Sequence, residues 1–162
     1  MSETMLKWAK VEKGVLMLTL NRPEVRNALC TELLGLLANR LEQAAEEDEF
    51  QCIVLSGGEK VFAAGADVIE IQDQNPLGAI SDVRVLYWKS IRNFPKPMLA
   101  AVNGFCLGGG LELAMCADVL IAGEKSLFGT PEINLGLIPG AGGTQLLPRI
   151  IGKQLAMKMV LS

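Results

Sequence analysis

The most informative segment of the sequence is AAVNGFCLGGGLEL, residues 100–113. A short apolar run typical of a buried strand leads through three consecutive glycines into the start of an apolar helix. The N-terminus of a helix presents unpaired N–H groups and the positive end of its dipole, and glycine lets a ligand approach the backbone closely. The segment therefore predicts a site for an anion, or for an oxygen that becomes negative during a reaction.

These glycines fit neither of two common phosphate-binding motifs. The Rossmann fingerprint requires G-x-G-x-x-G, which the spacing of Gly104, Gly108, Gly109 and Gly110 does not supply. The P-loop requires Gly-Lys-Ser or Gly-Lys-Thr after its loop, and the sequence contains no such triplet. Nucleotide binding through either motif is therefore not expected.

Two glutamates are candidates for acid–base chemistry. Glu112 comes three residues after Gly109, so one helical turn would bring it to the face that carries the Gly109 amide. Its neighbours are apolar, and a carboxylate in such surroundings needs a partner or a raised pKa. Glu132 follows Pro131 and would lie in the first turn of a short helix. Each could instead be an ordinary surface glutamate, and the sequence leaves open whether the two meet.

A third candidate segment is FAAGAD, residues 62–67. Its small side chains would let a ligand lie against the backbone, and Asp67 would fall at the start of a short helix. We expect the N–H of Ala66 to be free. As a local pattern, the segment also fits an ordinary tight turn.

Composition narrows the possible chemistry. The 162-residue chain carries a net charge of -3 and no histidine. The acidic balance gives no reason to expect nucleic-acid binding. Without histidine or a CxxC pair, a zinc site is not expected, and Ser-His and Cys-His nucleophiles are excluded. Acid–base work would fall to carboxylates, Lys, Tyr or Cys. The cysteines are interpreted as free thiols in a reducing compartment: Cys30, Cys52, Cys106 and Cys116.

No apolar stretch approaches the roughly 20 residues that cross a bilayer, and the first ten residues lack the apolar region of a signal peptide. We therefore predict a cytoplasmic protein without a membrane partner.

Strand and helix patterns alternate along the chain, which predicts an α/β fold with parallel pairing in a single domain, residues 1–162. The expected strands cover residues 6–11, 15–20, 52–55, 98–102 and 119–122. The expected helices cover residues 31–47 with Thr31 as the cap, 81–94 with Ser81 as the cap, 109–116, and the tail from Gln145.

Five segments in register resemble the enoyl-CoA hydratase/isomerase family, also called the crotonase family. They are residues 21–29 (NRPEVRNAL), 62–67, 97–112, 128–132 (FGTPE) and 136–144 (GLIPGAGGT). The resemblance implies a crotonase-like spiral of ββα units that binds an acyl-CoA thioester. Family members usually continue beyond the length of this chain with helices that close the acyl pocket and form trimer contacts. The C-terminal helical part is therefore expected to be missing here.

The resemblance also implies roles for individual residues. The amides of Ala66 and Gly109 would form an oxyanion hole for the thioester carbonyl. Glu112 and Glu132 would hold a water and act as base and acid, in an order that stays open. The residues implied in substrate, CoA and water binding are Ala64 (near the adenine), Ala66, Asp67, Val68, Ile69, Gly109 and Gly140 (a water-positioning amide).

The activity implied is an enoyl-CoA hydratase, a lyase that adds water syn across the double bond of a 2-enoyl-CoA to give a 3-hydroxyacyl-CoA. No metal and no cofactor are expected, because acyl-CoA is itself the substrate. Full-length members are expected to be homotrimers or dimers of trimers. The alternatives are a Δ3,Δ2-enoyl-CoA isomerase, another reaction of this fold, or a non-catalytic CoA-binding or assembly module. Acyl-chain length and pathway, fatty-acid metabolism included, stay open.

Overall fold

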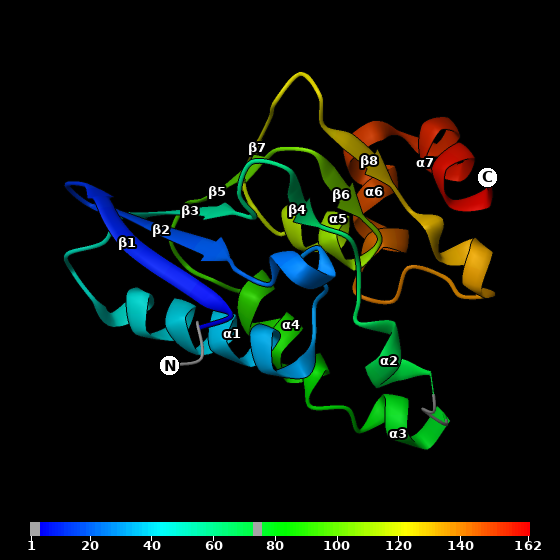
Figure 1. The fold of residues 1–162 in the computed structure, drawn as a ribbon, viewed down its shortest axis with the longest axis horizontal. Coiled ribbons are helices and arrows are strands. Elements are labelled where there is room, and N and C mark those ends of the chain that lie inside the picture. Colours follow the sequence, from blue (N-terminus) through cyan, green and yellow to red (C-terminus); the bar gives the residue numbers. More distant parts are fainter. Residues whose placement is uncertain (1–3, 73–75) are drawn as a thin grey trace.

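A computed structural model of the protein describes residues 4–72 and 76–162. Its main layer is a five-stranded sheet in the order β1-β2-β3-β5-β7 (Figure 1). The first pair is antiparallel and the other pairs are parallel. The strands are β1 (Leu6–Glu12), β2 (Val15–Leu20), β3 (Cys52–Ser56), β5 (Met98–Val102) and β7 (Val119–Ala122). The predicted strands are confirmed, and so is the predicted parallel pairing except between β1 and β2.

A second, three-stranded parallel sheet has the order β4-β6-β8. Its strands are β4 (Val61–Ala63), β6 (Phe105–Leu107) and β8 (Leu127–Gly129). Each follows a strand of the large sheet, and helical segments follow each in turn. This is the repeated ββα arrangement that the family resemblance implied.

The helical segments surround these sheets. They are η1 (Pro23–Val25), α1 (Thr31–Glu46), α2 (Val68–Ile71), α3 (Pro76–Ile80), α4 (Arg84–Arg92), α5 (Gly109–Ala114), η2 (Pro131–Leu135), α6 (Gly143–Ile151) and α7 (Lys153–Leu161). Figure 1 shows α1 and α4 together beside the large sheet, and α6 and α7 at the other end of the molecule. The small sheet and α5 lie between these two ends.

Periodic burial explains the longer elements. In β2, β3 and β5 every second side chain is buried, as a half-covered sheet requires. Helix α1 buries the predicted leucine stripe, Leu33, Leu34, Leu37 and Leu41. Its N-cap, however, is Cys30, whose sulfur accepts the Leu33 N–H, whereas Thr31 is the first helical residue and its hydroxyl donates to Glu70. The predicted Thr31 cap was therefore wrong.

The start of α4 also differs from the prediction. The helix begins at Arg84, and the carboxylate that accepts the Arg84 N–H belongs to Asp82. The Ser81 hydroxyl instead donates to the Leu77 carbonyl of α3. The predicted tail helix is real but consists of α6 and α7, separated at Gly152, whose φ of 80° is left-handed. No helix that the structure describes is long and apolar enough to cross a membrane.

Candidate active site

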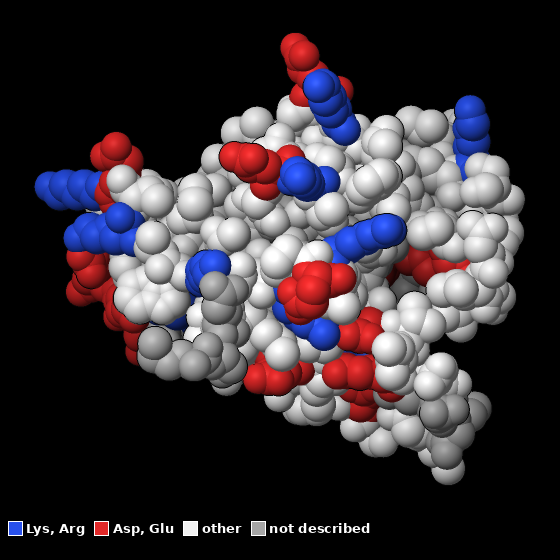
Figure 2. Space-filling view, viewed as in Figure 1, with Lys and Arg blue, Asp and Glu red and all other residues white. Residues whose placement is uncertain are grey.

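A cavity of about 500 Å³ lies between the segment α2–α4 on one side and η2 with the following loop on the other. Figure 2 shows the surface hollowed between these two parts, on a face where basic and acidic side chains are interspersed. The cavity is lined by residues of all five segments that carry the family resemblance, among them Ala66, Gly109, Glu112 and Glu132. The structure therefore brings the candidate catalytic residues to one place.

Two backbone amides meet at one wall of this cavity. A Cβ placed on Gly109 would lie 3.3 Å from the Ala66 nitrogen, so the two peptide groups are neighbours. Neither amide donates a hydrogen bond to any residue that the structure describes. Gly109 is the first residue of α5, where helix geometry leaves the N–H unpaired. The two N–H groups can therefore both donate to an oxygen on which negative charge develops.

The glycines beside these amides are required by close approach. A Cβ on Gly110 would lie 2.3 Å from the Ala63 carbonyl oxygen, a distance that real side chains do not reach. Gly108 has φ 50° and ψ -125°, and its absent side chain leaves room for the Glu132 carboxylate, whose Oε1 lies 3.1 Å from the Cβ position. The triple glycine thus lets β4, α5 and Glu132 converge.

Glu112 is buried, with 2% of its surface exposed. Its Oε1 accepts hydrogen bonds from the backbone N–H groups of Ala141, at 2.8 Å, and Gly143, at 2.7 Å. Burial raises the pKa of Glu112, while these two amides and the charge of Arg92 act in the opposite direction. Glu112 is therefore not the solvent-facing glutamate of the alternative interpretation.

Glu132 is half-buried in the first turn of η2. Its Oε2 is buried and has no hydrogen-bond partner among the described residues. Burial raises the pKa of Glu132, and its own backbone N–H lowers it. Glu132 is also close enough to Glu112 to raise the pKa of that residue electrostatically. The two carboxyl groups thus form a pair in surroundings that oppose double ionisation.

Sequence reasoning missed the loop that holds Glu112. The donors Ala141 and Gly143 belong to the segment that leads into α6, and the Ala141 carbonyl accepts a hydrogen bond from Arg92 of α4 at 2.9 Å. A Cβ on Gly143 would lie 2.9 Å from Glu112 Oε1. The glycine-rich run before a helix pattern was the available signal, because such a run exposes amides to an anion.

The other predicted binding residues separate into two groups. Ala64, Val68 and Gly140 line the cavity. Asp67 instead forms an ion pair with Arg22 at 3.0 Å and donates its N–H to the Leu29 carbonyl. Ile69 is 78% exposed and does not line the cavity. The structure thus brings Ala66 and Val68, but not Asp67 and Ile69, to the cavity wall.

Asn27 organises the segment that carries Ala66. It is buried, and its Nδ2 donates to the carbonyls of Gly57, Val61 and Phe62 at 2.8–3.1 Å. Its Oδ1 accepts the Arg22 N–H at 2.8 Å. One side chain therefore connects the η1 turn with β4 just before the Ala66 amide.

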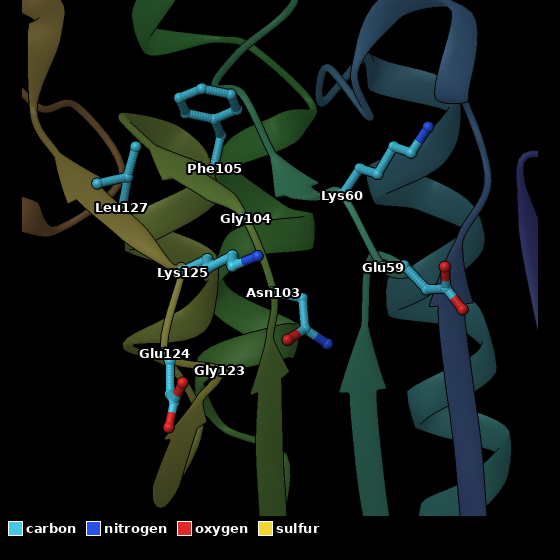
Figure 3. Close-up of a pocket in the computed structure, with 9 residues that line it drawn as sticks. All are labelled: Glu59, Lys60, Asn103, Gly104, Phe105, Gly123, Glu124, Lys125 and Leu127. Carbon is cyan, nitrogen blue, oxygen red and sulfur yellow. The ribbon is translucent and has the colours of Figure 1, made fainter.

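A second cavity, of about 570 Å³, lies at the turns that connect the two sheets. Figure 3 shows its lining, which comes from the β3–β4, β5–β6 and β7–β8 connections. The turns pack tightly, since a Cβ on Gly104 would lie 1.7 Å from the Lys60 carbonyl oxygen. The glutamates of the first cavity do not line this one. Within residues 4–72 and 76–162, no group of three His, Cys, Asp or Glu side chains could hold a metal ion.

Comparison with known proteins agrees with this geometry. The model of the family described as enoyl-CoA hydratase/isomerase matches residues 10–162. The chain belongs to this family. Among curated relatives of the chain, a 2,3-dehydroadipyl-CoA hydratase of Escherichia coli (strain K12) is 50% identical over 93% of the chain. A mitochondrial enoyl-CoA hydratase of Pongo abelii is 48% identical over 90% of it.

Solved structures of the hydratase/isomerase family share the fold. An enoyl-CoA hydratase from Bacillus anthracis has a TM-score of 0.89 and 38% identity, and the match covers 97% of the chain and 62% of that structure. The chain spans 59% of the length of the Escherichia coli relative and 50% of that of the Pongo abelii relative. The predicted family and the crotonase-like fold are both confirmed.

Proposed function

We propose that the protein adds water to 2-enoyl-CoA thioesters to give 3-hydroxyacyl-CoA. The observation that carries the proposal is the convergence of Glu112 and Glu132 on the cavity that also contains the unpaired amides of Ala66 and Gly109. Water addition at C3 moves negative charge onto the thioester oxygen. Two fixed amide donors would stabilise that charge, and loss of one such donor typically costs about 100- to 1,000-fold in rate.

The surroundings of the two carboxyl groups suggest which one carries a proton. Glu112 receives two backbone N–H groups and is close to Arg92, and each of these favours its ionised form. Glu132 receives only its own backbone N–H. Burial raises the pKa of both carboxyl groups, and the additional donors to Glu112 are the reason to place a proton shared by the pair on Glu132. In this scheme, Glu112 removes a proton from the attacking water and Glu132 supplies one to C2 of the acyl chain.

Gly140 is proposed to help position the water through its backbone amide. The residue lines the cavity next to Ala141, whose amide holds Glu112. Ala64 lines the same cavity, in agreement with its proposed place near bound CoA. Neither proposed role requires a side chain, and both therefore depend on the path of the backbone.

The substrate class is proposed from the same features. The Escherichia coli relative is named for 2,3-dehydroadipyl-CoA, a conjugated thioester whose acyl chain ends in a carboxylate. We propose that conjugated 2-enoyl thioesters in general are substrates of the present chain. No metal and no separate cofactor enter the scheme, and a cytoplasmic location remains part of the proposal.

Assembly into a homotrimer, or a dimer of trimers, is also proposed. All four residues of β7 are exposed at the edge of the large sheet, and Val119 and Ile121 are apolar. Exposed apolar strands of this kind commonly pair with another surface. Sedimentation equilibrium would test this, and a monomer at all concentrations would contradict it.

The hydratase proposal is tested with crotonyl-CoA, by following the loss of absorbance of the conjugated thioester. Glu112→Gln and Glu132→Gln should each lower kcat by about 100- to 10,000-fold, while a saturated acyl-CoA still binds. Glu124→Gln, in the exposed β7–β8 turn, is the matched control. An unchanged rate in either site variant would remove that residue from the mechanism. Tight CoA binding without turnover would favour the binding-module alternative, and a 3-enoyl-CoA converted faster would favour the isomerase.

A further inference from the structure

The cavity continues beyond the two glutamates to a wall built by α1, α2, α3 and α4. This wall is mostly apolar and includes Leu34, Val68, Ile71, Val85 and Trp88. Two charged residues interrupt it, Asp82 and Arg84. Their side chains are only 11% and 12% exposed. A half-buried guanidinium in a mostly apolar wall marks a place where a specific polar group is expected.

Asp82 fixes the guanidinium of Arg84 from one side. The Nε of Arg84 donates to Oδ1 and Oδ2 of Asp82, at 2.9 Å each, and Nη2 donates to Oδ2. Asp82 Oδ1 also accepts the backbone N–H of Arg84, so the carboxylate is anchored at the start of α4. Both ends of the ion pair are therefore held by the same turn of chain.

One edge of the Arg84 guanidinium is not used in the contact with Asp82. Nη1 of Arg84 donates to none of the residues that the structure describes, and Nη2 carries a second hydrogen. A planar guanidinium presents such neighbouring N–H groups as a fork that matches the two oxygens of a carboxylate. The remaining edge is therefore suited to a bidentate acceptor rather than to a methyl group.

The acidic side chains near Arg84 offset its positive charge, so an anionic ligand would be recognised by the geometry of its hydrogen bonds rather than by net charge. Asp82 and, more weakly, Glu70 raise the pKa of Arg84, which stays protonated. The Glu70 carboxylate accepts the N–H and the hydroxyl of Thr31, each at 2.7 Å, and is thereby bound to the start of α1. A ligand anion near Arg84 would thus gain from well-aligned hydrogen bonds, not from a broad positive field.

We propose that Arg84 binds a carboxylate at the far end of the acyl chain, so that the preferred substrates are 2-enoyl-CoA thioesters of dicarboxylic acids. This inference rests on the proposed function, because it assumes that the thioester lies at Ala66 and Gly109 and that the acyl chain extends towards α4. A chain that ends in a methyl group would remove water from the free N–H groups of Arg84 without replacing the hydrogen bonds. Sites built for such bonds discriminate strongly against analogues that lack them.

The kinetic test compares two six-carbon substrates, 2,3-dehydroadipyl-CoA and trans-2-hexenoyl-CoA, which differ only in the terminal group. We expect the wild-type kcat/KM to favour the dicarboxylic substrate by at least about tenfold. Arg84→Leu should lose roughly 10- to 100-fold on that substrate alone, and Arg84→Lys should lose less, because it keeps the charge without the fork. Lys89→Leu, on the exposed face of α4, is the control. Equal losses on both substrates would overturn the inference.

A binding test separates this inference from the proposed function. Calorimetric titration of wild-type protein with adipyl-CoA and with hexanoyl-CoA, neither of which can be hydrated, requires no turnover. Tighter binding of adipyl-CoA, lost in Arg84→Leu, would support the role of Arg84 even if neither enoyl-CoA were hydrated. Equal wild-type affinities would overturn it, even if crotonyl-CoA were hydrated rapidly and even if the Arg84 variants failed to fold.

Discussion

Glu112 and Gly143 are in such close contact that the glycine N–H donates to Glu112 Oε1 at 2.7 Å and a Cβ on the glycine would lie 2.9 Å from the same atom. Gly143→Ala should therefore displace the carboxylate or the loop, since the added methyl group also lies 2.8 Å from the Pro139 Cβ. We expect a loss of about 1–3 kcal/mol in the free energy of unfolding and at least a tenfold fall in kcat. Thr144→Ala, the next residue, is the control, and a fully active Gly143→Ala would contradict the contact.

The raised pKa of Glu132 predicts a pH-dependent stability difference. Because burial favours the neutral carboxyl, the stability contributed by protonation is fully present below the usual pKa of 4.5 and is lost as the pH rises through the higher folded value. Glu132→Gln stays neutral throughout and should melt at a higher temperature than wild type at pH 7.5.

That gain in Tm should shrink as the pH is lowered to about 4.5. Thermal melts across this pH range test the prediction. Asn134→Ala is the control, because Asn134 lies on the same short helix and its side-chain amide does not titrate. A constant Tm difference at all pH values would exclude the effect of burial on Glu132.

Arg92 is predicted to act on the site through Glu112. Its hydrogen bond to the Ala141 carbonyl orders the loop, and its charge lowers the pKa of Glu112. In Arg92→Met the pKa of Glu112 should rise, so the acid limb of the pH profile of kcat/KM should move to higher pH, with a loss of up to about tenfold in rate. Lys89→Met should leave the profile unchanged. A rate loss without any shift of the limb would assign Arg92 a purely structural part.

Asn27 is predicted to be important for stability. Alanine there would leave three carbonyls and the Arg22 N–H without their partner in a buried turn, and the residue has a left-handed φ of 56°. We expect Asn27→Ala to lower the free energy of unfolding by about 2–4 kcal/mol. Urea denaturation gives this value. Among the described residues, Asn21 Nδ2 donates to the Thr4 carbonyl alone, so Asn21→Ala should cost below about 1 kcal/mol.

Long periodic elements were predictable from the sequence, and the short ones were not. The leucine stripe of α1 and the alternating burial of β2 and β5 extend over enough residues to reveal a period. Strands β4, β6 and β8 have three residues each, too few for any period, and they exist because neighbouring turns of the spiral supply their partners. Helix α4 was shifted because Asp82, not Ser81, satisfies its first N–H groups.

The candidate site was predictable where its signal was local. The glycines before α5 and the proline before Glu132 indicated exposed amides and a positioned carboxylate. The donors to Glu112 come from 29 and 31 residues further along the chain, and no spacing rule connects such distant partners. Arg84 was missed for a similar reason, since its burial depends on helices that pack around it only in the folded protein.

The hydrogen bonds from Ala141 and Gly143 to Glu112 also set an order of events during synthesis. A nascent chain that has emerged only as far as Leu137 contains both glutamates and both oxyanion amides, but not the donors that solvate Glu112. Burying that carboxylate in its ionised form without them is costly, so we expect α5 to reach its final position only after the residues up to Gly143 have left the ribosome. The cavity around Glu112 is thus expected to form only once the loop that donates to this glutamate has been synthesised.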